Sequence, residues 1–126
     1  MKKKIKIKVG IDSPVAAGAG TISKLIAKNY KLLYLDTGKI YRFMARQIID
    51  KKPKNKLKFL KKISRNINLN KLKQRNLLND DVAYLASQIA KDLKVRNLVV
   101  RFQRRLAYHP PNKYNGSILD LSLIHI

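Results

Sequence analysis

The chain has no cysteine and no glutamate, and it contains no long run of apolar residues. Without cysteine it can form neither a disulfide nor a thiolate metal site, and a reducing compartment is the simplest environment for it. All seven acidic residues are aspartates, so no glutamate is available as a catalytic acid or base. The apolar runs fall far short of the roughly 20 residues that a membrane-spanning helix needs, and we therefore expect no membrane partner.

Negative charge is scarce as well. Twenty-nine Lys and Arg residues stand against seven Asp, which gives a net charge of +22 over 126 residues. A field of that size attracts polyanions such as nucleic acid, nucleotides or acidic membranes. However, the chain is rich in Lys, Asn and Ile together, the bias that an A+T-rich coding sequence produces. Nucleic-acid binding and compositional drift are therefore alternative explanations of the charge.

Residues 3–12 predict the first strand. Ile5, Ile7 and Val9 alternate with lysines at a period of two. We expect one face of this strand to be wet, or the lysine stems to lie along apolar neighbours with their heads in water. The same alternation replaces the apolar core that a signal peptide needs, so the sequence predicts no targeting segment and a cytoplasmic protein.

The strand runs into a turn of small residues at 13–21, and a helical pattern follows from Ile22 to Tyr30. This layout is typical of a phosphate-binding loop, in which backbone N–H groups converge on an anion at a helix N-terminus. The usual fingerprint is Gly-x-x-x-x-Gly-Lys-Ser/Thr, and here it is incomplete. Ser13 stands where the first glycine belongs, and Ala19 replaces the lysine. A close helix–strand packing corner is the alternative interpretation.

The rest of the chain alternates predicted strands and helices. Strand, helix, strand and helix in succession indicate a βαβ arrangement within one domain. Thr37 is the predicted N-cap of the second helix, and Asn79 or Asp80 that of a later one. The further predicted elements are a strand at 32–36, helices at about 37–50, 79–90 and 95–108, and a strand that begins at 117–120.

Residues 51–75 are the most basic part of the chain, with eleven Lys or Arg among 25 residues. A thin apolar thread predicts one short helix at about 55–64, followed by irregular or extended chain. This segment is either an anion-binding lobe or a solvated, mobile insertion, and the sequence leaves both open.

Several separated segments together resemble the bacterial cytidylate kinase family, the CMP and dCMP kinases of the P-loop nucleoside monophosphate kinase class. The stretch 35–42, LDTGKIYR, is the most specific of them. Residues 11–21, 82–90 with Val95 and Arg96, and 118–120 follow the family in order and spacing. The resemblance covers residues 3–120 and is weakest over the basic segment.

The resemblance implies an α/β fold: a P-loop NTPase-type parallel sheet flanked by helices, incomplete, with the first three core strands only. Residues 1–120 would form the N-terminal part of a nucleoside monophosphate kinase domain, with 51–78 as a basic insertion on the acceptor side. It further implies a cytoplasmic, monomeric enzyme of pyrimidine nucleotide metabolism that transfers a phosphoryl group from ATP to CMP or dCMP with Mg²⁺. Neither a membrane nor a specific nucleic acid is an expected partner.

The resemblance also assigns site residues. Arg42 and Arg96 would hold the phosphate of the acceptor nucleotide, and Thr37 and Ser87 would lie among the hydroxyls around nucleotide and base. Thr21 and Asp120 are the candidate Mg²⁺ residues. The predicted ATP-binding residues are Ser13, Pro14, Val15, Ala16, Ala17, Gly18, Ala19, Gly20 and Thr21.

Three departures from the family stand out. Ala19 removes the phosphate-binding lysine, for which Lys24 would be a substitute one turn into the helix. The basic segment is shorter than the small antiparallel acceptor-binding sheet that is common in the family. Finally, after Asp120 the family would continue Gly-Arg-Asp, then two more strands, an arginine-rich lid and closing helices.

Residues 121–126, LSLIHI, replace that continuation. They are what CTG-TCT-CTT-ATA-CAC-ATC encodes, the mosaic end of a transposase-based sequencing adapter. We therefore hypothesise that these six residues are not biological, that the chain is a fragment, and that it is inactive as written. His125 is accordingly no site candidate.

Two other functions remain open at this stage. A small basic nucleic-acid-binding protein would show affinity that falls steeply with salt, although the aromatic residues are not interleaved with the basic ones as a stacking platform requires. A kinase-like protein that binds nucleotide through the altered loop without turnover is the other.

Overall fold

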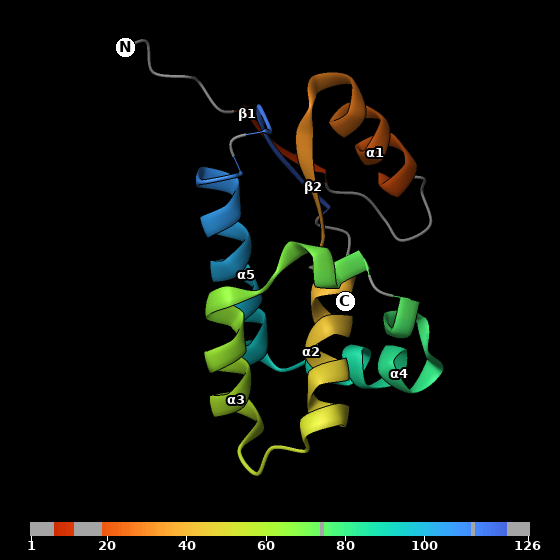
Figure 1. Ribbon diagram of the computed structural model, residues 1–126, viewed down its shortest axis with the longest axis vertical. Helices are drawn as coiled ribbons and strands as arrows, with labels where there is room; N and C mark the ends of the chain where they lie inside the picture. Colours follow the sequence, from red (N-terminus) through yellow and green to blue (C-terminus); the bar gives the residue numbers. More distant parts are fainter. Residues whose placement is uncertain (1–6, 12–18, 74, 112, 121–126) are drawn as a thin grey trace. The chain divides into compact units, whose positions relative to one another are not determined.

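The computed structural model describes residues 7–11, 19–73, 75–111 and 113–120 (Figure 1). These residues fall into two compact units, one from 1–37 and 103–126, the other from 38–102. The elements in chain order are β1 (Ile7–Ile11), α1 (Ala19–Tyr30), β2 (Leu32–Asp36), α2 (Thr37–Lys51), α3 (Lys56–Ile63), the short 3₁₀ turns η1 (Ser64–Asn66), η2 (Leu69–Lys73) and η3 (Arg75–Leu78), α4 (Asp80–Ile89), α5 (Leu93–Tyr108) and β3 (Gly116–Asp120).

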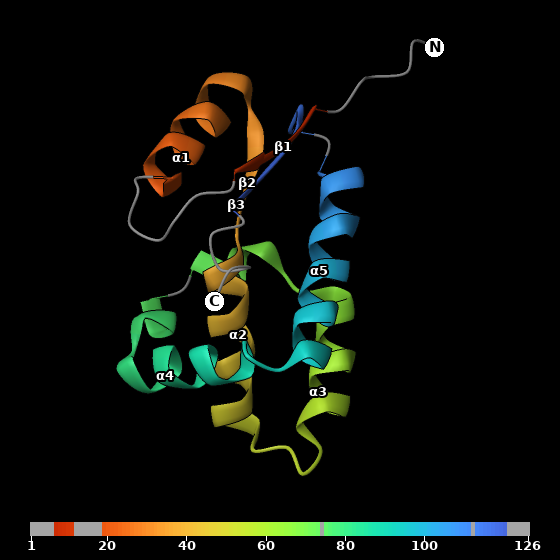
Figure 2. The ribbon, with the colours of Figure 1, turned by 180° about the vertical axis from the view of Figure 1, so that it is seen from behind.

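The first unit is built on a parallel sheet of three strands in the order β1-β3-β2. Helix α1 covers one face of the sheet against β2 and β3, as Figures 1 and 2 show from opposite sides. Ala27 of α1 packs with Leu32 and Ile118 there, and Ile118 on the central strand is fully buried. The three strands and the helix–sheet packing confirm the predicted α/β class, in its coarse form of a small parallel sheet with helices.

The connection between α1 and β2 is tight. Lys31, the first residue after α1, adopts a left-handed conformation with φ of 54°, and this conformation ends the helix. Asn115, just before β3, donates its backbone N–H to the Lys31 carbonyl oxygen at 2.8 Å and its side-chain amide to the Tyr30 carbonyl oxygen at 3.1 Å. Asn115 therefore satisfies carbonyl groups that the end of α1 would otherwise leave unpaired.

Of the lysines that alternate with apolar residues in the predicted first strand, Lys8 is described, whereas Lys4 and Lys6 lie outside the described residues. The Lys8 side chain is exposed, and its Nζ lies 4.5 Å from the centroid of the Tyr108 ring. The Lys8 ammonium group therefore remains solvated while it also contacts the face of the Tyr108 ring.

The second unit is helical, with a core of apolar side chains from every one of its α-helices. The largest fully buried apolar side chains among these are Ile40, Met44, Leu60, Val82 and Val99. Local sequence fixes two of the helix starts. Asn55 accepts a hydrogen bond from the Lys58 N–H at 3.0 Å, and Asn79 accepts one from the Asp81 N–H at 2.7 Å. Asparagine is among the residues that N-caps favour. Asn79 was one of the two predicted caps of its helix, whereas Asn55 was predicted as the approximate start of a helix and is its N-cap.

Two local predictions need correction. Thr37 is the first residue of α2 and not its N-cap, because α2 follows β2 without an intervening residue. The turns η1, η2 and η3 form where irregular or extended chain was predicted, and Ile67, Leu72 and Leu77 are buried in or between them. These three buried side chains pack this stretch against the rest of the unit, although their spacing in the sequence does not follow a helical period. In the part of the chain that is described, no helix is long and apolar enough to cross a membrane.

Candidate functional site

The carboxyl ends of the three strands meet at one edge of the sheet. Asp120 at the end of β3 is in register with Ile11 of β1 and with Asp36 of β2. Residues 12–18 follow β1, and Thr37 follows β2 at once. In open α/β sheets ligands bind outside the carboxyl ends of the strands, so this edge is the candidate ligand-binding edge of the first unit.

The predicted ATP-binding loop lies largely outside the described residues, since these exclude Ser13, Pro14, Val15, Ala16, Ala17 and Gly18. What is described is the point where the loop ends: the backbone of Ala19, Gly20 and Thr21 forms the first turn of the 12-residue helix α1. A strand, a loop and a helix N-terminus therefore follow one another, which is the order that a phosphate-binding loop requires.

Thr37 is 3 % exposed, and its hydroxyl accepts a hydrogen bond from Nε2 of Gln103 at 2.6 Å. Gln103 is 4 % exposed and lies 66 residues away in the sequence, on α5. The sequence analysis missed Gln103. The signal was present, because Gln103 falls on the same helical face as Val99 and so places an amide in an apolar stripe.

In the second unit the structure brings Arg96 of α5 to Tyr41 of α2. Tyr41 is 5 % exposed and accepts a side-chain hydrogen bond from Arg96. Burial raises the pKa of the Tyr41 hydroxyl above its ordinary value, and the charge and hydrogen bond of Arg96 oppose this only in part. The neutral Tyr41 hydroxyl thus accepts a hydrogen bond from Arg96. Tyr41 directly precedes Arg42 in the sequence of α2.

Arg42 and Ser87 are the other two acceptor-side candidates. The Arg42 side chain is half-buried and makes neither an ion pair nor a hydrogen bond with any described residue. The Ser87 side chain is exposed, and its hydroxyl donates to the Tyr84 carbonyl oxygen at 2.6 Å within α4. The structure therefore joins Arg96 to Tyr41 by a hydrogen bond, but it joins Ser87 to neither Arg42 nor Arg96 in this way.

Comparison with known proteins decides the family. The cytidylate kinase family matches residues 9–116, which is most of the chain. The chain belongs to the cytidylate kinase family. It is 39 % identical over 113 residues to a cytidylate kinase of Sinorhizobium medicae and 35 % identical over 117 residues to one of Bartonella quintana. In both cases the alignment covers 89 % of this chain and 51 % of the relative, so the chain spans about half the length of the curated cytidylate kinases it matches.

The side chains of Thr21 and Asp120, the two candidate Mg²⁺ residues of this cytidylate kinase family member, lie outside what the structure describes. The strand register places the backbone of Asp120 opposite that of Asp36 at the carboxyl ends of β3 and β2. Among the described residues no group of three or more His, Cys, Asp or Glu forms a metal cluster. In kinases Mg²⁺ is usually held by one or two protein oxygens together with nucleotide phosphates, so a dedicated protein cage is not required for it.

Ala19 stands where the family pattern has the loop lysine, and Lys24 was the candidate substitute for that lysine. Its Nζ lies 5.9 Å from the centroid of the Tyr34 ring on β2. A contact between Lys24 and a phosphate would therefore require this side chain to leave the aromatic ring.

Proposed function

We propose that the protein to which this chain belongs transfers the γ-phosphoryl group of ATP to CMP or dCMP, and that the chain carries the phosphate loop and the acceptor side of that enzyme. The observation that supports this best is the buried Tyr41–Arg96 hydrogen bond within a chain of the cytidylate kinase family. Phosphoryl transfer asks the protein mainly to position the reactants and neutralise their charge, and an arginine held by a buried partner suits that task.

On the acceptor side, Arg42 and Arg96 bind the monophosphate in this proposal. Arg42 has no described protein partner, so its guanidinium is available to a phosphate, whereas Arg96 is held by Tyr41 before substrate arrives. Thr37 and Ser87 contact the nucleotide through their hydroxyls. For Ser87 this requires the hydroxyl to turn away from the Tyr84 carbonyl.

On the donor side, the loop from Ser13 to Thr21 holds the ATP phosphates in this proposal, through backbone N–H groups of its residues other than Pro14, which has none. Thr21 and Asp120 are the proposed Mg²⁺ residues. The metal would neutralise charge on the phosphates during transfer. Because Ala19 supplies no ammonium, a protein that binds nucleotide without turnover is a second candidate function, favoured by that one residue.

We further propose that residues 1–120 are part of a monomeric cytoplasmic kinase, with 51–78 as an insertion on the acceptor side, and that 121–126 are adapter-derived. In that case the 126-residue chain lacks the lid arginines and is inactive. Arginines of that kind are worth about 10³–10⁵ in rate in phosphoryl transfer. The nucleotide sequence of the genomic locus tests the adapter proposal, since an uninterrupted locus that ends in those codons contradicts it.

Calorimetric titration of the chain with CMP, dCMP and UMP tests the binding proposal. We expect the cytidine nucleotides to bind more tightly than UMP and Arg42→Gln to weaken CMP binding about 10- to 100-fold, since a hydrogen bond to a charged group is worth roughly 1.5–3 kcal/mol. Arg101→Gln is the matched control, because Arg101 is an exposed arginine of α5 outside the proposed site. Equal losses in the two variants, or equal affinity for CMP and UMP, contradict the proposal.

A further inference from the structure

Helix α3 and the turn after it carry a basic surface that the proposed kinase chemistry does not use. We define the α3 basic face as the residues that line an open hollow of about 700 Å³ on this element: Asn55, Lys58, Phe59, Lys61, Lys62 and Arg65. Lys58, Lys61 and Lys62 lie on α3, and Arg65 lies in the 3₁₀ turn η1 that follows it. Between them in the sequence, Leu60 and Ser64 are buried at 1 % and 3 % exposure.

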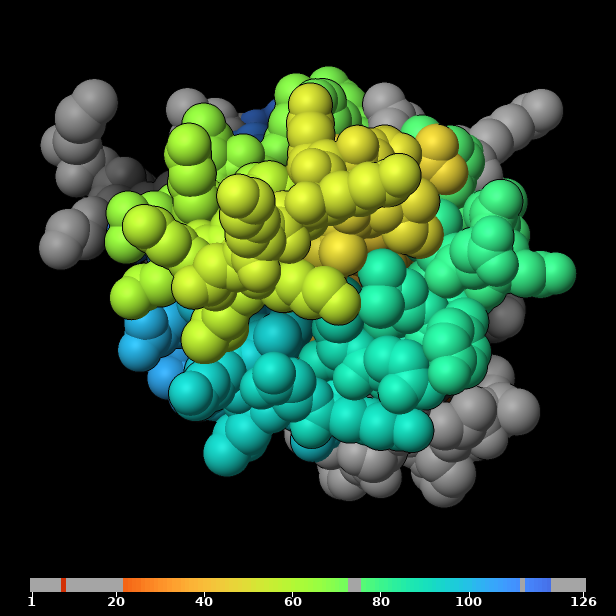
Figure 3. Space-filling model, turned by 90° about the horizontal axis from the view of Figure 1, so that it is seen from below, coloured from red at the N-terminus to blue at the C-terminus, as the bar shows by residue number. Residues whose placement is uncertain are grey.

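The four cations are exposed and unneutralised. No described residue forms an ion pair or a hydrogen bond with the charged group of any of them. The sequence explains this, because no Asp or Glu occurs anywhere in residues 51–79. In Figure 3 the segment that contains them, coloured yellow to yellow-green, projects long side chains from the surface.

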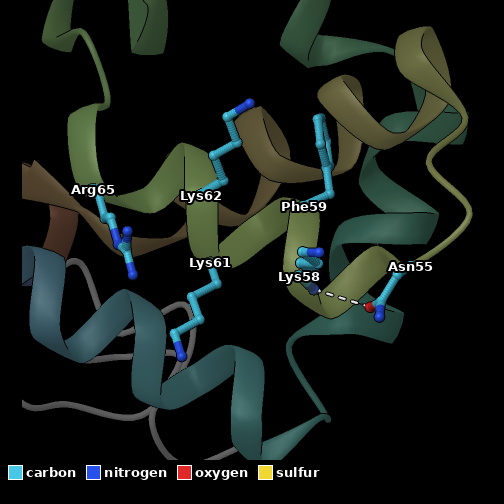
Figure 4. Close-up of a pocket in the computed structure, with 6 residues that line it drawn as sticks. All are labelled: Asn55, Lys58, Phe59, Lys61, Lys62 and Arg65. Carbon is cyan, nitrogen blue, oxygen red and sulfur yellow. Dashed lines mark hydrogen bonds between the residues drawn. The ribbon is translucent and has the colours of Figure 1, made fainter.

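The side chains of the α3 basic face fan out along the helix and do not converge on a point. Figure 4 shows Lys61 and Arg65 pointing to one side and Phe59 and Lys62 to the other, with Lys58 between them. From Lys58 to Arg65 the cations extend over about 10 Å of helix axis, at 1.5 Å per residue. This geometry suits an extended chain of negative charges better than one compact anion.

One aromatic residue, Phe59, lies among these cations, although over the chain as a whole the aromatic and basic residues are not interleaved. Phe59 is half-buried and lines the hollow, and its side chain points to the same side of the helix as Lys62 (Figure 4). Proteins that bind single strands combine a basic track for the backbone with aromatic side chains on which bases stack. A duplex keeps its bases stacked inside and would leave such a ring unused.

We propose that the α3 basic face binds single-stranded nucleic acid, with Lys58, Lys61, Lys62 and Arg65 on successive phosphates and a base against Phe59. This binding is separate from the proposed kinase function and does not depend on it. It gives the basic segment an anion-binding role without assigning it to the acceptor nucleotide.

Fluorescence anisotropy with a labelled single-stranded oligouridylate of about 12 nucleotides tests the proposal, since single-strand sites span roughly 4–16 nucleotides. Four phosphate contacts predict a contribution of about −2.8 to the slope of log K against log salt, or a roughly 50-fold loss of affinity between 50 and 200 mM salt. The quadruple variant K58Q/K61Q/K62Q/R65Q is expected to lose that contribution. Gln is nearly as good a helix former as Lys and Arg, so α3 should persist in the variant, which circular dichroism checks.

A second quadruple variant separates the α3 basic face from the net charge of the chain. K91Q/K94Q/R101Q/R104Q removes the same number of positive charges from exposed positions on and next to α5. We expect it to change the slope by less than about one unit. If both quadruple variants lose affinity and slope equally, binding follows overall charge and the proposal is overturned.

Phe59→Leu tests the stacking contact, because leucine keeps the packing of the half-buried position but removes the aromatic face. At about 1–3 kcal/mol per stacked base, affinity should fall at least about fivefold with the salt slope unchanged. Unchanged affinity in Phe59→Leu, or equal affinity of the wild-type chain for a duplex of the same length, overturns the single-strand assignment.

Discussion

Replacing Gln103 with leucine is expected to destabilise the chain, because Thr37 would lose a buried hydrogen-bond donor. The two groups are 2.6 Å apart and at most 4 % exposed. A neutral hydrogen bond contributes about 0.5–1.5 kcal/mol net, and an unsatisfied buried group costs about 1–3 kcal/mol. Since Thr37 takes part in a further interaction, we expect Gln103→Leu to lower the free energy of unfolding by about 1–2 kcal/mol.

The partner variant, Thr37→Val, leaves the Gln103 amide buried without its acceptor and should cost about 1–3 kcal/mol. In the double variant both partners are apolar, so its cost should be smaller than the sum of the single costs by about 1 kcal/mol. Urea unfolding followed by circular dichroism measures all three, since the chain has no tryptophan to serve as a fluorescent probe. Gln88→Leu is the control, because Gln88 is exposed on α4 and its replacement should change stability by less than about 0.5 kcal/mol.

Additivity would refute this reasoning. If the double-variant cost equals the sum of the single costs within about 0.3 kcal/mol, Gln103 and Thr37 are not energetically coupled. The hydrogen bond between Gln103 and Thr37 would then contribute nothing measurable to the stability of the folded chain.

The other stability predictions concern Tyr41 and two buried serines. Tyr41→Phe should cost about 1 kcal/mol near neutral pH through the lost contact with Arg96. Because burial raises the folded pKa of Tyr41 above 10.0, the stability that this group contributes is fully present below about pH 10 and is lost as pH rises through the folded pKa. Wild-type stability should therefore fall more steeply in that range than that of Tyr41→Phe, and parallel pH curves in urea titrations would exclude this. Ser23→Ala and Ser117→Ala should each raise stability by up to about 1 kcal/mol, since both hydroxyls are fully buried without a described partner. Exposed Ser87→Ala is their control in thermal unfolding, and a loss of stability in both buried variants but not in the control would mean that those hydroxyls are hydrogen-bonded.

Local features of the fold could be predicted from the sequence because their physical causes are local. Asn55 and Asn79 cap helices through their own side chains, and each needs only the next two or three residues to do so. The strands at β2 and β3 are short apolar runs followed by Asp, and their parallel pairing follows from the helices between them.

Long-range pairings could not be predicted in the same way. The sequence gives no register for β3 between β1 and β2, and nothing adjacent to Thr37 points to Gln103, 66 residues away. The Tyr41–Arg96 contact depends likewise on how α2 packs against α5. The 3₁₀ turns η1, η2 and η3 were missed because isolated buried side chains such as Leu72 and Leu77 carry no regular period.

The residues of the candidate site were predicted from the resemblance to the family, whereas their contacts are known only from the structure, and only for some of them. Arg96 has a buried partner, whereas the Ser87 hydroxyl is bonded within its own helix. The ATP loop from Ser13 to Gly18 lies outside the described residues, and its role stays a prediction.

A coupled ADP-release assay tests the central claim most directly. It should use the chain extended to full length from its own genomic locus, with CMP, dCMP and UMP as acceptors, alongside the Ala19→Lys variant. We predict turnover with CMP and dCMP and much slower turnover with UMP, in the natural chain if the missing lysine is compensated and otherwise only in Ala19→Lys. Folded protein that shows no turnover in either form, or equal turnover with all three acceptors, would contradict the assignment of Thr37, Arg42, Ser87 and Arg96 to a cytidine nucleotide.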